Sequence, residues 1–498
     1  MAALLGVADA DRRGAVDQVE VTGISLASGE VRRGDLYAAL PGSRRHGAEF
    51  VPQAAAAGAA AVLTDEPGAA AAREAGLPAI VVPDPRGVLG RASAWVYGDP
   101  TRDLTVIGIT GTAGKTSTCY LIESGLREAG RGTGLIGTVE TRLGATVVDS
   151  VRTTPEATDL QALFAVAVES GIEAVVMEVS SHALALGRVD GARFTVGGYT
   201  NFGLDHLDFH ADADEYFAAK ALLFDGRCRV EVLNLDEPPL HKLLKPATVT
   251  YSASGDPHAA WRAVDVRADG YRQTFTALGP DAVAVPAAVG LPGRHNVANA
   301  LLAIACLVAT GVDPAIAARG VAACRGVPGR LERVDAPGPV LGVVDYAHKP
   351  DAIVAALAAL RHLGTGRLIC VIGAGGDRDR GKRPLMGAAA ARGADLVIVT
   401  DDNPRTEDPA AIRAEVLRGA RETGGAQVSE VDGRRAAIAE AVRIARPGDV
   451  VALLGKGHER GQEVGGEVYP FDDRVELAAA LRDRFGEHAG SVEVGGRA

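Results

Sequence analysis

The clearest chemical signal in the chain is the motif GTAGKT at residues 111–116, which follows an apolar run over residues 104–110. Glycines in such a turn allow backbone N–H groups to face phosphate oxygens at the start of a helix. Lys115 would contact the β- and γ-phosphates, and Thr116 would reach a Mg²⁺ ion. The spacing departs from GxxxxGK[ST], because Ile109 stands where the first glycine would be. We expect a phosphate-binding loop, with a chance turn as the alternative.

A second apolar run, over residues 174–179, contains a carboxylate near its end. A buried Glu178 would be costly unless it were paired or bound to a metal ion. Mg²⁺ takes oxygen ligands and keeps several waters, so one or two protein ligands suffice. His206 is a candidate companion ligand, although either residue could equally be a satisfied structural group. Zinc is disfavoured, because no cysteine and no HExxH spacing accompanies the histidines.

Three charged clusters follow successive apolar runs in the last third of the chain: GDRD at 376–379, DNPR at 402–405 and GKGHE at 455–459. Because ligands bind beyond the carboxyl ends of parallel strands, we expect the clusters to converge on one site. Arginine can grip a carboxylate with two bonds, and acidic residues can hold an ammonium group. The clusters suit a zwitterionic amino acid with an additional carboxylate, and surface ion pairs are the alternative for any single one.

The elements that must position these groups are those of an α/β protein. Apolar strands alternate with amphipathic helices, and a length of 498 residues is enough for about three domains. We expect a small α/β domain over residues 1–100, a central P-loop domain with a parallel sheet over 101–330, and a Rossmann-like domain over 331–498. Lys220 lies on an amphipathic helix, where its own context indicates an ordinary surface lysine.

Composition excludes several classes of protein. The 52 basic and 63 acidic residues give 52 − 63 = −11, so no overall positive field would attract nucleic acid. No apolar stretch reaches the roughly 18 to 20 residues of a membrane span. The first residues lack a basic start and a long apolar core, so we expect a cytoplasmic protein. The five scattered cysteines indicate reduced core thiols.

In order and spacing, these motifs resemble the ATP-dependent Mur ligases of peptidoglycan synthesis, most closely those that add the third residue of the peptide. The resemblance covers essentially the whole chain. It rests on GTAGKTS (111–117), TTPE (153–156), MEVSSH (177–182), TNFGLDHLDFH (200–210), AAKALLF (218–224), GRHNVANA (293–300), PGRLE (328–332), DYAHKPD (345–351), GDRDRGKRPLM (376–386), DDNPR (401–405) and GKGHE (455–459).

The resemblance implies three domains, which hold the UDP end of a substrate, ATP, and an incoming amino acid. It implies amide-bond formation through an acyl phosphate, with Lys115, Lys220 and His206 as catalytic residues. The lysine matching Lys220 is carbamylated by CO₂ in this family, and such a carbamate would support a magnesium site with Thr116, Glu178 and His206. The implied ATP-binding residues are Gly111, Thr112, Ala113, Gly114, Lys115, Thr116, Ser117, His295, Asn296, Asn299, Arg330 and Asp345.

The implied substrates are UDP-N-acetylmuramoyl-L-alanyl-D-glutamate and meso-2,6-diaminopimelate. Family members that use meso-diaminopimelate carry the DNPR motif, and a second carboxylate on the acceptor would suit Arg405. The implied amino-acid pocket comprises Arg378, Asp402, Asn403, Pro404, Arg405, Gly455 and Glu459. The implied contacts to the UDP substrate come from Ser28, Thr153, Thr154, Ser180 and Arg188.

Three alternatives remain. L-lysine could be the acceptor, the chain could be a folylpolyglutamate synthetase-like ligase, or it could be a nucleotide-dependent switch that catalyses no ligation. One departure from the family pattern is visible near the N-terminus. Ala27-Ser28-Gly29 stands where the family often has Asp-Ser-Arg, so only Ser28 of that contact is retained.

Overall fold

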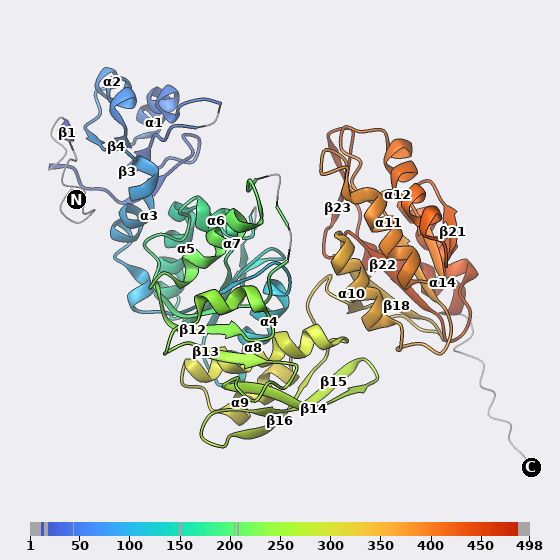
Figure 1. Ribbon diagram of the computed structural model, residues 1–498. Helices are drawn as coiled ribbons and strands as arrows, with labels where there is room; N and C mark the ends of the chain where they lie inside the picture. Colours follow the sequence, from blue (N-terminus) through green and yellow to red (C-terminus); the bar gives the residue numbers. More distant parts are fainter. Residues whose placement is uncertain are drawn as a thin grey trace, which may run out of the picture. The chain divides into compact units, whose positions relative to one another are not determined.

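The computed structural model describes residues 11–13, 18–42, 44–148, 152–203, 205–206 and 209–486 (Figure 1). The chain divides into two compact units. The first is formed by Met1–Arg262, Gly279–Asp281 and Leu301–Gly320, and the second by Ala263–Leu278, Ala282–Ala300 and Val321–Ala498.

The N-terminal part of the first unit is a five-stranded sheet between two layers of helices. Its elements are β1 (Asp11–Arg13), β2 (Gly23–Ser25), β3 (Asp35–Ala38), η2 (Gly47–Phe50), α1 (Val51–Ala57), β4 (Ala61–Thr64), α2 (Glu66–Glu74), β5 (Ala79–Val81) and α3 (Pro85–Val96). The strand order is β1-β5-β4-β3-β2, and only β1 is antiparallel to its neighbour. Leu36 and Ala38 pack with α3, whereas Tyr37 and Ala39 pack with α1 and α2, as expected for a strand whose side chains alternate between faces.

A larger sheet follows, with parallel strands at its centre. Its elements are η3 (Pro100–Arg102), β6 (Thr105–Thr110), α4 (Lys115–Glu128), β7 (Thr133–Ile136), β8 (Thr141–Leu143), β9 (Thr146–Val148), α5 (Ala157–Glu169), β10 (Ala174–Glu178), α6 (Ser181–Ala185), β11 (Phe194–Tyr199), α7 (Ala213–Ala221), η4 (Leu222–Phe224), β12 (Cys228–Asn234), η5 (Pro238–Leu243), β13 (Val249–Ser252), β14 (Trp261–Asp269), β15 (Arg272–Leu278), β16 (Ala284–Val289), α8 (Arg294–Ala309) and α9 (Pro314–Ala322). Strand β6 lies between β10 and β11, parallel to both. In this register Ile109 pairs with Glu178 and Thr110 pairs with Tyr199, so the loops after all three strands begin side by side.

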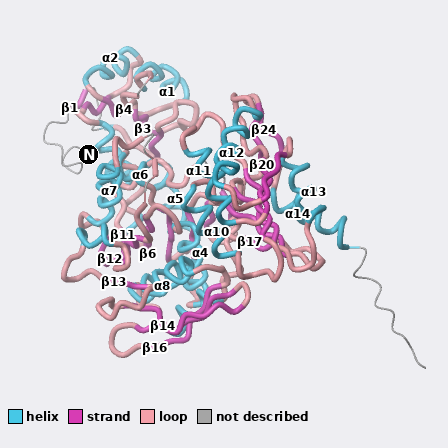
Figure 2. Tube along the Cα trace, turned by 45° about the vertical axis from the view of Figure 1, so that its right-hand side comes forward, coloured by secondary structure: helices cyan, strands magenta, loops and turns pink. Residues whose placement is uncertain are grey.

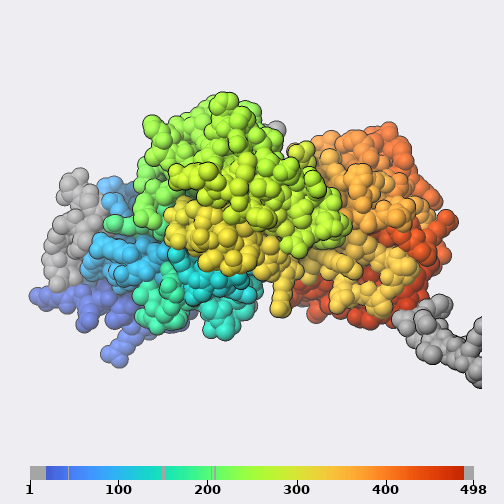
Figure 3. Space-filling model, turned by 90° about the horizontal axis from the view of Figure 1, so that it is seen from below, coloured from blue at the N-terminus to red at the C-terminus, as the bar shows by residue number. Residues whose placement is uncertain are grey.

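Within the first unit, the backbone of helix α3 lies against the backbone of residues 190–191, which precede strand β11 of the larger sheet. A Cβ atom on Gly90 would lie 2.2 Å from the carbonyl oxygen of Asp190, and one on Gly191 would lie 2.4 Å from that of Gly90. Neither position therefore has room for a side chain. The space-filling view shows the blue and green segments of this unit lying against one another (Figure 3).

The C-terminal part of the second unit is a doubly wound sheet with a separate hairpin. Its elements are β17 (Glu332–Arg333), β18 (Leu341–Asp345), α10 (Pro350–Leu360), β19 (Leu368–Ile372), α11 (Lys382–Gly393), β20 (Leu396–Val399), α12 (Pro409–Thr423), β21 (Gln427–Glu430), α13 (Arg434–Ile444), β22 (Val450–Leu454), β23 (Gly461–Val464), β24 (Glu467–Pro470) and α14 (Asp473–Phe485). The strand order is β17-β18-β22-β19-β20-β21, and every pair except β17–β18 is parallel. Helices α10, α11 and α12 pack on one face, and α13 and α14 on the other (Figure 2).

The apolar runs that precede the three charged clusters correspond to β19, β20 and β22, and β18 lies next to β22. These strands are adjacent and parallel, so their carboxyl ends share one edge of the sheet, as predicted. All five cysteines are free thiols, and four of them are buried, in agreement with the prediction of reduced core thiols. None of the helices in the described part of the chain is long and apolar enough to cross a membrane.

Candidate active site

The phosphate-binding motif forms the turn between β6 and α4, as the sequence predicts. Gly111 and Gly114 have φ angles of 142° and 84°, which favour glycine. A Cβ on Gly111 would lie only 1.8 Å from Thr200 Oγ1, so this position is also closed sterically. Asn201, which follows β11, accepts a hydrogen bond from the Ala113 N–H through its side-chain oxygen at 3.0 Å. The turn is thus held in shape by the neighbouring strand and leads into the N-terminus of a 14-residue helix.

Two lysines meet at one carbonyl oxygen of this turn. Lys115 Nζ donates to the oxygen of Gly111 at 2.8 Å, and Lys220 Nζ donates to the same oxygen at 2.9 Å. Lys220 is 1% exposed and lies over the ring of Tyr216, 4.6 Å from its centroid. The sequence context alone indicated a surface lysine, and that interpretation is wrong. The apolar residues of α7 pack inward together with Lys220, so the lysine is drawn to the phosphate loop.

Glu178 is the buried carboxylate that the sequence singled out. Its Oε1 accepts hydrogen bonds from Thr116 Oγ1 at 3.0 Å and from the Thr138 N–H at 2.8 Å, and its Oε2 accepts one from Thr138 Oγ1 at 3.2 Å. These bonds offset the cost of burying the charge. A Cβ on Gly137 would lie 2.6 Å from Glu178 Oε1, so any side chain at this position would crowd the carboxylate.

The residues around Glu178 fit a magnesium ion. Thr116 and Glu178 bring together hydroxyl and carboxylate oxygens, the donors that Mg²⁺ prefers. Among the described residues, no group of three His, Cys, Asp or Glu side chains could hold a metal ion. Mg²⁺ also keeps waters as ligands, so a few protein oxygens suffice to hold it. Lys220 as an ammonium could not ligate a cation, whereas a carbamate on it would supply oxygens.

His206 lies in a group of rings beside α6 and α7. Its ring is 4.8 Å from that of His182 and 6.1 Å from that of Tyr216, and its Nε2 is 3.0 Å from Asp205 Oδ2. Tyr216 therefore contacts both His206 and Lys220. His206 also has a φ angle of 54°, a left-handed conformation unusual for a non-glycine residue. Leu204, Leu207 and Asp208 of the same motif lie outside the described residues.

Four residues predicted to contact the UDP substrate lie together. Thr154 Oγ1 donates to the carbonyl oxygen of Glu178 at 2.9 Å and accepts from the Ser180 N–H at 3.1 Å. Thr153 Oγ1 is 3.0 Å from Thr138 Oγ1, so this group continues into the contacts of Glu178. Arg188 Nη1 donates to the Thr154 carbonyl oxygen at 3.5 Å.

Glu156 orients this group and was missed at the sequence level, although it belongs to the TTPE motif. Its Oε1 is 2.9 Å from Arg188 Nε, and its Oε2 is 3.6 Å from Arg86 Nη1 of α3. Ser28, the fifth predicted residue, lies in the N-terminal sheet domain, where its hydroxyl donates to Gln53 of α1. Nothing in the sequence indicated that an arginine of α3 would reach Glu156.

The predicted adenine and ribose residues all belong to the second unit. Asn296 donates to the Pro292 carbonyl oxygen at 2.8 Å, and Asn299 donates to Asn296 Oδ1 at 3.1 Å. His295 Nε2 lies 3.2 Å from Asn296 Nδ2. The Arg330 guanidinium lies over the ring of Tyr346, 4.8 Å from its centroid. Asp345 accepts hydrogen bonds from the Leu331 and Ala347 N–H groups at 2.6 and 2.8 Å. Burial raises the pKa of the Asp345 carboxyl, against the opposing charge of Arg330.

The predicted amino-acid pocket lies at the loops after β19, β20 and β22. Asn403 Nδ2 donates to Glu459 Oε2 at 2.8 Å, and a Cβ on Gly455 would lie 2.4 Å from Asp402 Oδ2. Arg405 Nη1 donates to the Gly376 carbonyl oxygen at 2.6 Å. Asp402, Asn403 and Pro404 are buried, whereas Arg378 is exposed and donates to the Asp377 carbonyl oxygen. The predicted convergence of the three clusters is therefore present in the structure.

Lys456 is the principal group in this pocket that sequence reasoning left without a role. Its side chain is fully buried, and Nζ donates to Asn403 Oδ1 at 3.0 Å and to Glu459 Oε2 at 3.1 Å. The lysine thus sets which way the Asn403 amide points and balances the charge of Glu459. Its place within GKGHE was a signal, but lysines are mostly exposed, so the sequence did not favour a buried one.

Two arginines with buried side chains anchor the loops of this predicted pocket through ion pairs. Arg434 and Asp473 have no exposed side-chain surface and are joined by bonds of 2.7 and 2.6 Å. Arg434 also donates to the carbonyl oxygens of Leu454 and Asp401, which precede two of the pocket loops. A second anchor is Glu407, which accepts from Arg383 at 2.7 Å and from the Asp377 N–H at 2.6 Å.

The Glu407 anchor predicts a pH-dependent stability. The hydrogen bond from Arg383, followed by that from the Asp377 N–H, lowers the pKa of Glu407 from 4.5 to about 2. Since the folded-state pKa lies below the unfolded value, its contribution is present above pH 4.5 and is lost as the pH falls toward 2. We expect Glu407→Gln to lower the urea midpoint at pH 7, and to do so less at pH 3. Glu422→Gln, at an exposed position of α12, is the matched control, and an equal difference at both pH values would contradict the assignment.

A phosphate-binding loop at a helix N-terminus and charged loops that meet at one edge of a parallel sheet are features that an ATP-dependent ligase requires. Comparison with known protein families supports this class of enzyme. The Mur ligase catalytic domain model matches residues 20–97, the Mur ligase middle domain model matches 109–307, and the Mur ligase glutamate ligase domain model matches 329–457. The chain belongs to the Mur ligase family of ATP-dependent enzymes.

Individual relatives show which members of this family the chain is similar to. The chain is 54% identical to the UDP-N-acetylmuramoyl-L-alanyl-D-glutamate–2,6-diaminopimelate ligase of Streptomyces avermitilis, over 98% of this chain and 96% of the relative. A solved structure of a ligase with the same name has a TM-score of 0.67 and 33% identity, covering 93% of this chain and 95% of that one. A Mycobacterium tuberculosis folylpolyglutamate synthase, at TM-score 0.60 and 20% identity, covers 80% of this chain and 94% of its own, and shares the fold. The three-domain α/β fold expected from the sequence is confirmed.

Proposed function

We propose that this protein joins meso-2,6-diaminopimelate to UDP-N-acetylmuramoyl-L-alanyl-D-glutamate in the cytoplasm, with hydrolysis of ATP to ADP and phosphate. The proposal rests chiefly on Arg405, which closes the DNPR loop at one edge of the C-terminal sheet and donates to the Gly376 carbonyl oxygen of a neighbouring loop. Asn403 of the same DNPR loop donates to Glu459 of a third loop. The high identity to a ligase of that name over nearly the full chain supports the same substrates. The domains would be residues 1–100 for the UDP end, 101–330 for ATP and 331–498 for the amino acid.

The reaction would proceed in two steps. A carboxylate oxygen of the D-glutamate residue attacks the γ-phosphorus of ATP, which gives an acyl phosphate and ADP. The neutral amine of the acceptor then attacks the acyl carbon, the amide bond forms, and phosphate leaves while the amine loses its proton. Negative charge builds on oxygens in both steps, so cationic groups at the phosphate loop stabilise them. No nucleophile from the protein is required.

The phosphate loop would bind the β- and γ-phosphates through its backbone N–H groups and Lys115. The phosphate-binding residues are 111–117, and Thr116 would also be a ligand of Mg²⁺. Thr116, Glu178 and His206 would hold Mg²⁺ together with a carbamate on Lys220. The ion would neutralise charge developing on the phosphate oxygens. Adenine and ribose would contact the group formed by His295, Asn296, Asn299, Arg330 and Asp345.

Carbamylation of Lys220 is supported by the electrostatics of the loop. Two ammonium groups within 3 Å of the Gly111 carbonyl oxygen repel each other, and burial adds the cost of desolvation. Addition of CO₂ to the neutral amine of a lysine, with release of a proton, forms a carbamate. The conversion replaces a positive charge next to Lys115 by a negative one, so that repulsion becomes attraction.

The UDP substrate would lie along Thr153, Thr154, Ser180 and Arg188, with Ser28 as a contact from the N-terminal domain. The Thr153 hydroxyl is hydrogen-bonded to that of Thr138, which itself donates to Glu178. A substrate bound along these residues would therefore lie next to the proposed ligands of Mg²⁺. Arg188, fixed by Glu156, is suited to an anionic part of the substrate.

The acceptor's identity follows from the charges of the pocket. meso-Diaminopimelate carries a second amino-acid head, whose carboxylate suits Arg405 and whose ammonium suits Asp402 and Glu459. Arg378 would contact the same acceptor. L-Lysine ends in an ammonium, which Arg405 would repel. The likeness to folylpolyglutamate synthase concerns the fold, and the DNPR and GKGHE loops favour the diamino acid over glutamate.

The proposal is tested by incubating the purified chain with ATP, Mg²⁺, the UDP-muramoyl dipeptide and meso-diaminopimelate. We expect a UDP-tripeptide, detected by mass spectrometry, that is absent when ATP is omitted. A product formed with L-lysine and not with meso-diaminopimelate would keep the ligase and overturn the acceptor. The absence of any product would overturn the proposed function.

A further inference from the structure

The hairpin of β23 and β24 is attached along the DNPR loop, residue by residue. Gln462 Nε2 donates to the Asp402 carbonyl oxygen at 2.7 Å, and the Glu463 N–H donates to Asn403 Oδ1 at 3.0 Å. The Arg405 N–H donates to the Glu463 carbonyl oxygen at 3.0 Å, and the Gly465 N–H donates to that of Arg405 at 2.7 Å. The hairpin pairs with no other strand in the described part of the chain, so its position depends on this loop.

One side chain of the hairpin contacts the arginine of the pocket. Glu463 Oε2 accepts from Arg405 Nε at 3.0 Å, while Gly376 accepts from Arg405 Nη1 at 2.6 Å. These bonds hold two sides of the guanidinium and use two of its five N–H donors. Three donors remain for a ligand, and the plane in which they lie is fixed. Arg405 also has a left-handed backbone φ angle of 54°, so its main chain is held in an unusual conformation as well.

The carboxylates of the pocket explain why the Arg405 guanidinium needs to be held in one position. Asp402 and Glu459 belong to the same pocket, and either could attract an arginine that was not restrained. An Arg405 that turned toward them would neutralise the carboxylates that an acceptor's ammonium needs. Glu463 supplies a carboxylate on the outer side of Arg405, and it is the more exposed partner of the pair, at 38% against 20%. The ion pair thus keeps positive and negative recognition groups apart.

We propose that Glu463 is a positioning residue that sets acceptor specificity, by holding the Arg405 guanidinium in place for the second carboxylate of the acceptor. This inference rests on the proposed function. Glu463 itself does not touch the acceptor in this account. Its removal therefore affects binding of a dicarboxylate acceptor and leaves ATP binding unchanged.

The test is steady-state kinetics of ligation for the wild type, Glu463→Gln and Glu463→Ala. We expect Glu463→Ala to raise KM for meso-diaminopimelate about 10- to 100-fold, with KM for ATP within about twofold, because a hydrogen bond between charged groups is lost. Glu463→Gln, which keeps one acceptor oxygen without the charge, should lie between. Glu467→Ala, in the exposed strand β24 of the same hairpin, is the matched control and should behave as wild type.

A double-mutant cycle separates positioning from a general effect on the fold. In an Arg405→Ala background, Glu463→Ala should change KM for meso-diaminopimelate by less than about twofold, because the group it orients is gone. Additive effects, or an unchanged KM in Glu463→Ala alone, would overturn the inference while leaving the ligase intact. An inactive wild type would overturn the proposed function and this inference with it.

Discussion

Lys220→Ala is expected to abolish ligation while the protein stays folded. The substitution removes the side chain that would carry a carbamate beside the cation site, in a step where charge stabilisation contributes most of the rate. We expect kcat to fall by about 10³-fold or more, on the scale of losing a principal electrostatic contact in an active site. The measurement is tripeptide formation, with circular dichroism as the check on folding.

Rescue and labelling distinguish a carbamate from a simple structural lysine. A small carboxylic acid such as formate should restore part of the activity of Lys220→Ala, because it can supply oxygens in the space left behind. The wild type incubated with ¹³C-bicarbonate should give a carbamate carbon signal that Lys220→Ala lacks. Lys242→Ala, at an exposed lysine of η5, is the control. Full activity of Lys220→Ala would show that the lysine plays no part in the reaction.

Arg405→Ala is expected to lower kcat/KM for meso-diaminopimelate by about 10²- to 10³-fold. It removes a charge-assisted contact to one carboxylate, and the expected loss corresponds to about 3 to 4 kcal/mol. KM for ATP should remain within about twofold, since the substitution leaves the phosphate loop as it is. The preference for meso-diaminopimelate over L-lysine should fall with it.

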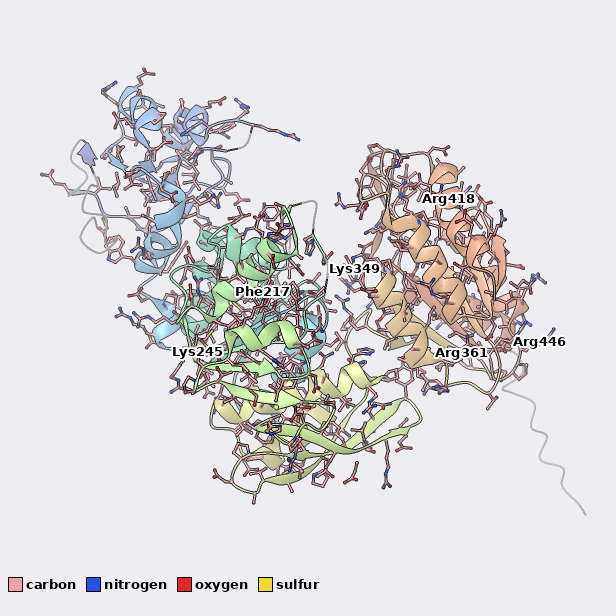
Figure 4. The ribbon with its side chains drawn as sticks, in the orientation of Figure 1. Phe217, Lys245, Lys349, Arg361, Arg418 and Arg446 are labelled. Atoms are coloured by element: carbon pink, nitrogen blue, oxygen red, sulfur yellow. The ribbon has the colours of Figure 1, made fainter. Side chains whose placement is uncertain are left out.

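The control for this prediction is Arg418→Ala, at an exposed arginine of α12 in the same domain (Figure 4). It removes the same side chain and charge without touching the pocket. Unchanged acceptor kinetics in Arg405→Ala would contradict the pocket assignment. An equal loss of ATP affinity would instead indicate that the arginine supports the domain as a whole.

Local patterns in the sequence predicted much of the site. The phosphate loop was predicted because its glycines and lysine are contiguous and lie between an apolar run and a helix. The convergence of the three charged clusters was predicted because loops after parallel strands meet at one edge, and β18, β22, β19 and β20 are neighbours. Glu178 was singled out because a carboxylate in an apolar run needs partners, and it has three hydrogen bonds.

Contacts between distant segments could not be predicted in this way. The side chain of Lys220 reaches a carbonyl oxygen 109 residues earlier in the chain, and α7 alone gives no sign of it. The ion pair between Glu463 and Arg405 joins two loops 58 residues apart. Periodicity indicates which face of an element is buried, but it does not indicate what a charged side chain at the edge of that face will meet. The positions most specific to this site are therefore the ones that the sequence pattern left open.

Ligation of the diamino acid is measured by phosphate release from ATP and Mg²⁺ in the presence of the UDP-muramoyl dipeptide. The comparison is between meso-diaminopimelate, L-lysine and no acceptor, with the peptide product measured in parallel. We expect sustained phosphate release with meso-diaminopimelate alone, matched one to one by UDP-tripeptide. Release that is the same with and without any acceptor would contradict this expectation and favour a nucleotide-dependent switch.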